Sequence, residues 1–203
     1  RWPLHAKLTL ITFAILFVLG TLAYLVLESV EGNVFVALDP GQRVLQASFM
    51  SAMARSGGFS TVDYGQLDGS SLLVTDMLMF VGGGSASTAG GIKVTTLAIL
   101  FLAAVAEARG SDEMEAYERR IPQDVLRLAV SVVLWGATLV AATTITLMLI
   151  TEAPLDHVLF DAISAFATCG LTTGFTASAD DPAQLVLAAT MFAGRIGTVT
   201  LAA

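Results

Sequence analysis

The sequence predicts an all-α membrane protein whose two halves are tandem repeats. Of the 203 residues, 55% are hydrophobic and only 13% are charged, and the mean hydropathy is +0.77. A soluble domain carries about 25% charged residues, so this composition is a poor match to a water-soluble fold. The net charge of −7 argues against nucleic acid as a partner.

Two similar strings indicate the repeat. Ser56-Gly57-Gly58-Phe59-Ser60-Thr61 matches Thr168-Cys169-Gly170-Leu171-Thr172-Thr173 at an offset of 112 residues, and this offset also aligns residues 79–82 with 191–194. Two separate blocks in one register indicate an internal repeat. We predict a first repeat over 1–110, a cytoplasmic connector over 111–124 and a second repeat over 125–203, with the chain being a piece of a longer protein.

The first repeat begins with a membrane span and a short helix. Leu8 to Leu27 is about twenty apolar residues, enough to cross a hydrocarbon core of about 30 Å. Arg1 and Lys7 precede this span, which predicts entry from the cytoplasm. Arg43 to Ala54, about twelve residues, is too short to span but suits a re-entrant pore helix. Its C-terminus carries the negative end of the helix dipole, which favours a cation beyond it.

The next apolar stretch, Leu72 to Ala106, is too long for one straight crossing. Its middle, residues 82–91, holds five glycines in ten residues, and glycine weakens a helix. We therefore predict a helix, an intramembrane loop and a second helix. Irregular backbone at membrane depth is tolerated only where it is buried in protein or lines a water-filled path.

The second repeat follows the same order. Val125 to Ile150 predicts a span, Asp156 to Ala167 a second pore helix, and residues 180–182 an outer turn. Gln184 to Ala203 begins the last span and carries Arg195 inside it. A charge at mid-membrane costs about 2.5–3.5 kcal/mol on insertion scales and is a functional candidate by default.

Acidic residues gather on the predicted outer side, where only Arg43 and Arg55 oppose them. An acidic mouth would concentrate cations, although an ordinary solvated surface explains the pattern equally well. These acids are Glu28, Glu31, Asp39, Asp63, Asp68, Glu152, Asp156, Asp161, Asp180 and Asp181.

The two repeated strings are uncharged and rich in small residues, which is typical of backbone that exposes successive carbonyls. Potassium-channel filters use such carbonyls to replace the hydration shell of the ion. Glycine reaches positive φ at low energy, which lets a carbonyl turn toward an axis. A glycine-rich turn between helices is the structural alternative. The predicted ion-binding residues, acting mainly through backbone carbonyls, are Ser56, Gly57, Gly58, Phe59, Thr168, Cys169, Gly170 and Leu171.

The strings over residues 49–61, 79–93 and 191–197 resemble the Trk/Ktr/HKT superfamily of potassium transporters, and most closely the membrane subunits of Ktr systems. The resemblance covers nearly the whole chain. It implies four repeats around one pore, of which these would be the third and fourth, with potassium bound at the filter residues. It also implies a gate under the filter, made of Gly82, Gly83, Gly84, Ser85, Ala86, Ser87, Thr88, Ala89, Gly90, Gly91 and Arg195.

The resemblance further implies partners and a location. The missing first and second repeats of the same chain would complete the pore. A homodimer would bind a cytosolic, nucleotide-binding regulatory ring at the plasma (inner) membrane, as a multi-pass protein. No covalent cofactor is expected; K⁺ is the transported ion and Na⁺ a candidate activator.

Three other classes of protein fit the sequence less well. A secondary transporter of a small solute fits broken helices and repeats, but not two filter-like strings at one offset. An intramembrane enzyme would need a catalytic pair at membrane depth, and Asp76 is the only acid that reaches it, so we expect no enzyme activity. A purely structural membrane partner leaves Arg195 unexplained.

Overall fold

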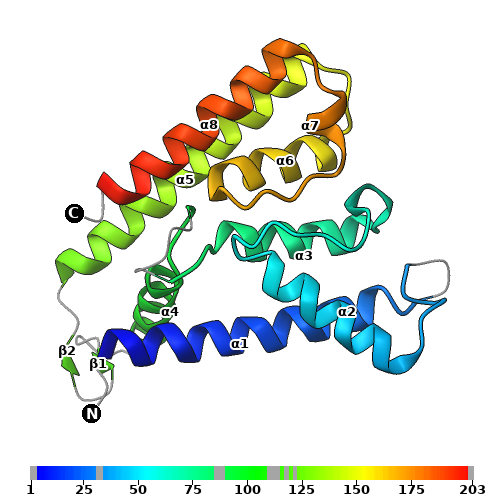
Figure 1. Ribbon diagram of the computed structural model, residues 1–203. Helices are drawn as coiled ribbons and strands as arrows, with labels where there is room; N and C mark the ends of the chain where they lie inside the picture. Colours follow the sequence, from blue (N-terminus) through cyan, green and yellow to red (C-terminus); the bar gives the residue numbers. More distant parts are fainter. Residues whose placement is uncertain are drawn as a thin grey trace.

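The computed structural model describes residues 4–30, 34–84, 90–108, 115–116, 119–120 and 123–200 (Figure 1). The helices are α1 (Leu4–Leu27), α2 (Pro40–Met53), the 3-10 turn η1 (Tyr64–Gln66), α3 (Gly69–Phe80), α4 (Val94–Ala108), α5 (Gln123–Ile150), α6 (Leu155–Ala167), α7 (Phe175–Ser178) and α8 (Asp181–Thr200). The prediction of a helical fold is confirmed. The connector also contains an antiparallel pair of two-residue strands, β1 (Glu115–Ala116) and β2 (Arg119–Arg120), which the sequence did not suggest.

Among the described residues, the helices α1 and α5 are long and apolar enough to cross a membrane. Only 11% of the most apolar window of α1 is buried, and side chains such as Phe13 and Val26 are exposed along it. On α5, residues Val140 and Leu147 are buried while Leu134 and Leu149 on the other side are exposed. Exposed apolar surface of this extent suits contact with lipid rather than water.

The long apolar stretch after η1 is broken, as predicted. Helix α3 ends at Phe80 and α4 begins at Val94. The two ends of the break are held together, because Val81 pairs with Ile92 in a parallel bridge and the Ile92 N–H donates to the Phe80 carbonyl over 3.1 Å. The break is therefore a loop with a closed neck; its central residues, 85–89, lie outside the described part of the chain.

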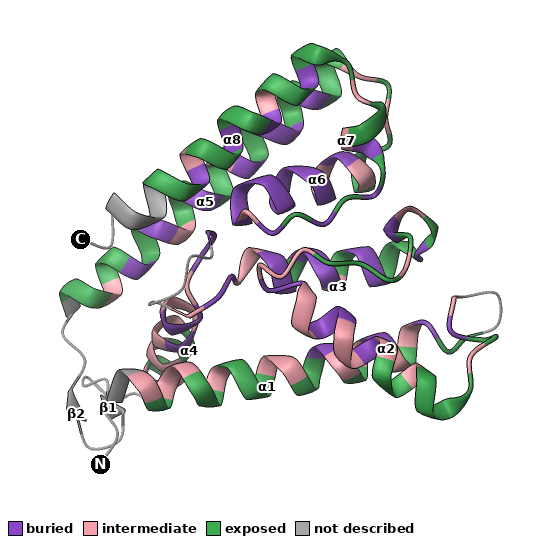
Figure 2. Cartoon of the chain, in the orientation of Figure 1, coloured by how far each residue is buried: buried purple, intermediate pink, exposed green. Residues whose placement is uncertain are grey.

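The short helix α6 lies at the centre of the described structure. It packs against α3 on one side and against α5 and α8 on the other, as Figure 1 shows. Every residue from Phe160 to Ala167 is buried, and the helix is almost wholly purple in Figure 2. The other short helix, α2, packs mainly on α1 and buries only Ala47, Met50 and Ser51. The two predicted pore helices thus have unequal surroundings.

Helix α8 reaches α6 through a glycine. A Cβ built on Gly194 would collide with the Phe166 carbonyl, so only glycine permits this approach of α8 to the last turn of α6. Across the neighbouring interface, the hydroxyls of Thr143 on α5 and Thr190 on α8 are hydrogen-bonded at 2.8 Å. The Gly194 contact places the C-terminal end of α6 against α8, and the threonine hydrogen bond joins α8 to α5.

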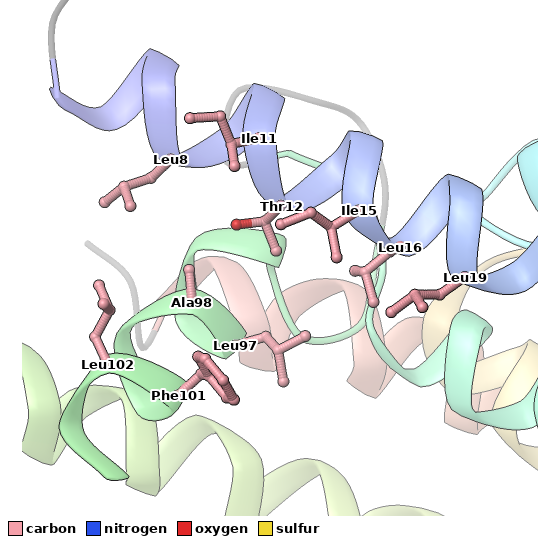
Figure 3. Close-up of a pocket in the computed structure, with 10 residues that line it drawn as sticks. All are labelled: Leu8, Ile11, Thr12, Ile15, Leu16, Leu19, Leu97, Ala98, Phe101 and Leu102. Atoms are coloured by element: carbon pink, nitrogen blue, oxygen red, sulfur yellow. The ribbon is translucent and has the colours of Figure 1, made fainter. Parts of the chain in front are cut away.

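Figure 3 shows an apolar cavity of about 540 Å³ between α1 and α4. Leu8, Ile15 and Leu19 line it from α1, and Leu97 and Phe101 line it from α4. The cavity extends the apolar surface of α1 to the helix that follows the broken segment.

Two parts of the outer-side prediction are wrong. Glu28 is fully buried and Asp161 is only 2% exposed, so neither belongs to an acidic surface. The predicted turn at residues 180–182 is instead the start of α8, because Asp181 begins the helix and a proline is tolerated in a first turn. The outer-side acids that the structure shows as exposed are Asp39, Asp63, Asp68, Glu152, Asp156, Asp180 and Asp181; Glu31 lies outside the described residues.

Candidate cation-binding site

The two loops that follow α2 and α6 have the same pattern of backbone conformation. Ser56 has φ 65° and Gly58 has φ 69°; Thr168 has φ 50° and Gly170 has φ 100°. These are matching positions at the offset of 112 residues. The left-handed conformation costs a non-glycine residue about 1–2 kcal/mol, so its recurrence on Ser56 and Thr168 requires support from the surroundings.

The glycines of the two loops bring their backbones into contact. A Cβ built on Gly58 would collide with the Cys169 carbonyl oxygen and would lie 3.4 Å from the Gly170 Cα. A Cβ on Gly170 would lie 3.6 Å from the Gly58 Cα. Two strings that are distant in sequence therefore meet at their central glycines, with no side chain between them.

Each loop also contacts the C-terminal end of the other loop's helix. The Ser56 hydroxyl lies 3.3 Å from the carbonyl oxygens of both Ala167 and Thr168. The Cys169 thiol lies 3.5 Å from the carbonyl oxygens of Met53 and Ala54. Both side chains act as donors to carbonyls at the negative ends of α6 and α2. Cys169 therefore contributes more than the backbone carbonyl expected from the sequence.

The second loop is held by a buried carboxylate, Asp161, which the sequence pattern predicts at the surface. Asp161 on α6 accepts five hydrogen bonds, from the Thr172 hydroxyl at 2.8 Å, from the Thr173 N–H and hydroxyl at 3.0 and 3.4 Å, and from the Thr176 N–H and hydroxyl at 2.9 and 2.6 Å. The sequence signal for this role is an acid within the apolar part of α6, followed by a threonine-rich string. Asp161 therefore fixes the exit of the second loop.

The first loop is held by different contacts. The residue at the position matching Asp161 is Phe49, and the Gln46 amide donates instead to the Thr61 hydroxyl at 2.5 Å. The fourth residues of the two strings also differ, since Phe59 is 73% exposed and Leu171 only 3%. Arg55, at the entrance of this loop, donates to the Phe13 carbonyl at 2.8 Å, with its guanidinium 4.4 Å from the centre of the Phe13 ring.

The end of the broken segment lies against the second loop. The Gly90 N–H donates to the Thr168 hydroxyl over 2.9 Å. A Cβ on Gly90 would lie 2.9 Å from the Ala167 carbonyl oxygen, and one on Gly91, which has φ 69°, would lie 3.4 Å from the Ala167 Cα. At the other end, Gly82 allows the close approach of the Gly90 carbonyl. The structure thus brings Gly82, Gly90 and Gly91 close to the C-terminal end of α6. The other predicted gate residues of the loop centre lie outside the described residues: Ser85, Ala86, Ser87, Thr88 and Ala89.

Arg195 lies near the same region. It follows Gly194, which packs on the carbonyl of Phe166 at the end of α6, and its charge interacts with that of Lys93 just before α4. Its side chain is exposed in the described part of the chain. A positive charge is therefore positioned beside the neck of the broken segment.

Two helices of membrane length, the buried short helix α6 and two glycine-containing loops in contact are features of a helical membrane transport protein. Residues 3–203 match the TrkH family, described as a cation transport protein, and the chain belongs to this family.

The relatives carry names consistent with this family. The chain is 36% identical to Ktr system potassium uptake protein B of Vibrio alginolyticus, over 98% of this chain and 44% of that protein. It is 33% identical to the potassium/sodium uptake protein NtpJ of Enterococcus hirae, over 98% of this chain and 45% of that protein. The chain therefore spans less than half the length of these relatives, which are transporters and not enzymes.

A solved structure shows the same fold. The crystal structure of the potassium transporter TrkH from Vibrio parahaemolyticus superposes with a TM-score of 0.76, over 96% of this chain and 42% of that chain. The sequence identity is 20%, so this likeness concerns the fold alone.

Proposed function

We propose that this chain forms two of the repeats that surround a potassium uptake pore, with residues 1–110 and 125–203 as the repeats and 111–124 as the cytoplasmic connector. The observation that supports the proposal is the pair of loops in contact, which share left-handed turns at matching positions and follow two short helices. The names of the relatives, which include potassium uptake proteins, agree with it.

The proposed filter uses backbone carbonyls to replace water around K⁺. The negative ends of α2 and α6 favour a cation at the two loops. Asp161, the Ser56 hydroxyl and the Cys169 thiol hold the loops in place, so the carbonyls need little reorganisation when the ion arrives. The filter residues are Ser56, Gly57, Gly58, Phe59, Thr168, Cys169, Gly170 and Leu171.

The proposed gate is the glycine-rich segment 82–91 together with Arg195. Its support is the hydrogen bond from Gly90 to Thr168, which joins this segment directly to a filter loop. Glycine-rich backbone with a closed neck can change conformation without disturbing α3 and α4. Arg195 would oppose cations beside the gate by its charge.

The remainder of the assembly is proposed from the relatives. Because the chain covers 44% of Ktr system potassium uptake protein B, the first two repeats would supply the other filter loops. Membership of a Ktr system suggests a homodimer with a KtrA-like, nucleotide-binding regulatory ring at the inner membrane. Na⁺ is either a second transported ion or an activator, since the name of NtpJ includes sodium.

The test of this function is ion flux through the full-length parent in vesicles, with its regulator present. Uptake of K⁺ in preference to Na⁺ is expected. Folded protein that carries no monovalent cation would contradict the pore proposal and favour transport of a small solute.

Arg195→Ala is expected to raise resting K⁺ flux on the order of tenfold. If the charge acts over an assumed distance of about 10 Å, at an effective dielectric constant of about 20, its removal lowers the barrier by about 1.7 kcal/mol. Arg195→Lys, which keeps the charge, should remain closer to wild type. Flux is measured by K⁺ uptake into vesicles.

Arg127→Ala is the matched control, because Arg127 is an exposed residue of α5 that pairs only loosely with Asp124 at 4.0 Å. It should leave resting flux unchanged. The gating role of Arg195 is refuted if Arg195→Ala and Arg127→Ala give the same flux.

A further inference from the structure

A second cavity, of about 400 Å³, lies between α3 and α6 and is separate from the filter loops. Figure 1 shows these two helices side by side. Leucines make most of the cavity wall: Leu72 and Leu73 from α3, and Leu155 and Leu159 from α6. The remaining lining includes two acids, which the proposed pore does not use.

Asp76 is the acid at the bottom of this cavity. It is 5% exposed, and its Oδ1 atom is buried without a hydrogen-bond partner among the described residues. Arg55, a buried cation of the same half, is directed to Phe13 instead. A buried carboxylate without a partner is unfavourable, and a positively charged ligand in the cavity would supply that partner.

Asp156 is the second acid, at the rim. It is exposed on the first turn of α6, and one carboxylate oxygen accepts from the neighbouring His157 N–H at 3.0 Å. The cavity therefore presents one acid to solvent and one at depth, with leucines along the walls. The two acids attract a cation, and the leucines can bury the apolar part of that cation away from water.

The lining favours an organic cation over a metal ion. Leucine walls offer no oxygen ligands, and the described residues contain no group of three His, Cys, Asp or Glu that could hold a metal. Hard metal cations such as Ca²⁺ require six or more oxygens. An ammonium group instead needs only a few acceptors, and the cavity volume lies within the range of about 300–1,000 Å³ typical of small-molecule sites.

We propose that the α3–α6 cavity binds a small primary alkylammonium ion, with its ammonium group at Asp76 and its alkyl chain on the leucines. The ion enters past Asp156. Bound there, it contacts both the helix that leads into residues 82–91 and the helix that leads into the second loop. The proposal does not depend on the pore assignment.

The experiment is thermal unfolding of the full-length parent with n-butylammonium chloride, against methylammonium and KCl at equal ionic strength. A saturable rise in Tm is expected with butylammonium, because a ligand that binds only the folded state stabilises it. Each additional buried methylene should tighten binding by up to about fourfold. Because K⁺ at the proposed filter would also stabilise the folded protein, the shift assigned to the α3–α6 cavity is the part of the butylammonium shift that is lost in Asp76→Asn, and a Tm that butylammonium leaves unchanged would overturn the proposal.

Asp76→Asn should weaken butylammonium binding at least about tenfold, since it removes a charge-assisted hydrogen bond. The variant should fold, because an asparagine amide is close in size and shape to the unpartnered carboxyl group that it replaces. Leu73→Trp is the second variant: it fills the cavity, leaves Asp76 in place and should reduce butylammonium binding more than methylammonium binding.

Two controls separate this site from others. Asp180→Asn changes an exposed acid outside the cavity and should bind butylammonium as the wild type does. Gly170→Ser alters a proposed filter loop and should also retain the shift in Tm. A shift that survives Asp76→Asn, or that is lost in Gly170→Ser, would refute binding at Asp76.

Discussion

Gly58→Ala is expected to abolish K⁺-selective flux, and to do so for a different reason from a substitution at Gly170. At Gly58 a methyl group would collide with the carbonyl of Cys169, which belongs to the other loop. Overpacking of this kind costs about 1–3 kcal/mol, in addition to about 1–2 kcal/mol for the left-handed backbone. The two loops must separate, and the proposed filter carbonyls move with them.

At Gly170 only the backbone conformation opposes the addition of a side chain. Its φ of 100° lies beyond the left-handed region that other residues tolerate, but a Cβ there would meet only the Gly58 Cα at 3.6 Å. Gly170→Ser is therefore expected to keep some flux but to lose much of the preference for K⁺ over Na⁺. A distortion that raises the barrier for K⁺ by about 1.4 kcal/mol lowers this preference by at least about tenfold.

Paired K⁺ and Na⁺ uptake measurements in vesicles distinguish these outcomes. Gly41→Ala is the control, because Gly41 lies in the exposed first turn of α2 and a Cβ there would meet nothing within 4 Å. It should leave selectivity unchanged. Wild-type selectivity in Gly58→Ala would show that contact between the loops is not required for conduction.

Asp161→Asn is expected to destabilise the protein by about 2–4 kcal/mol and to lower K⁺ selectivity. The carboxylate accepts hydrogen bonds from Thr172, Thr173 and Thr176, and hydrogen bonds to a charged group contribute about 1.5–3 kcal/mol each. The N–H groups of an asparagine amide would face some of these threonine N–H and O–H groups, and two donors cannot form a hydrogen bond with each other. The exit of the second loop should then lose its fixed position.

The measurements are thermal unfolding and the K⁺-to-Na⁺ flux ratio of the full-length parent. Asp156→Asn is the matched control, an acid on the same helix that is exposed, and it should change both quantities little. If Asp161→Asn unfolds at the wild-type temperature with unchanged selectivity, the carboxylate does not hold the loop.

Local sequence patterns predicted the positions of the helices. The end of α1 at Leu27 and the start of α6 at Leu155 agree with the predicted segments to within a residue, because hydropathy and segment length act along the chain. The break between α3 and α4 was also predictable, since five glycines in ten residues are incompatible with a continuous helix. The early start of α8 was missed because Asp and Pro favour both turns and first helical turns.

The candidate site was predictable only in part. The offset of 112 residues identified the two strings, and in the structure their central glycines, Gly58 and Gly170, are in contact. Composition alone could not place Asp161, because an acid between apolar residues is expected at the surface until its five hydrogen bonds to the threonines are seen.

The sequence by itself determined the membrane character, the short helices, the broken segment and the repeated strings, because these depend on neighbouring residues. Only the tertiary structure decided that the Cys169 carbonyl occupies the space beside Gly58, that Gly90 binds Thr168, and that Asp76 is left unpartnered in a cavity among the described residues. Each of these depends on segments that are distant in the chain and meet only when the helices pack.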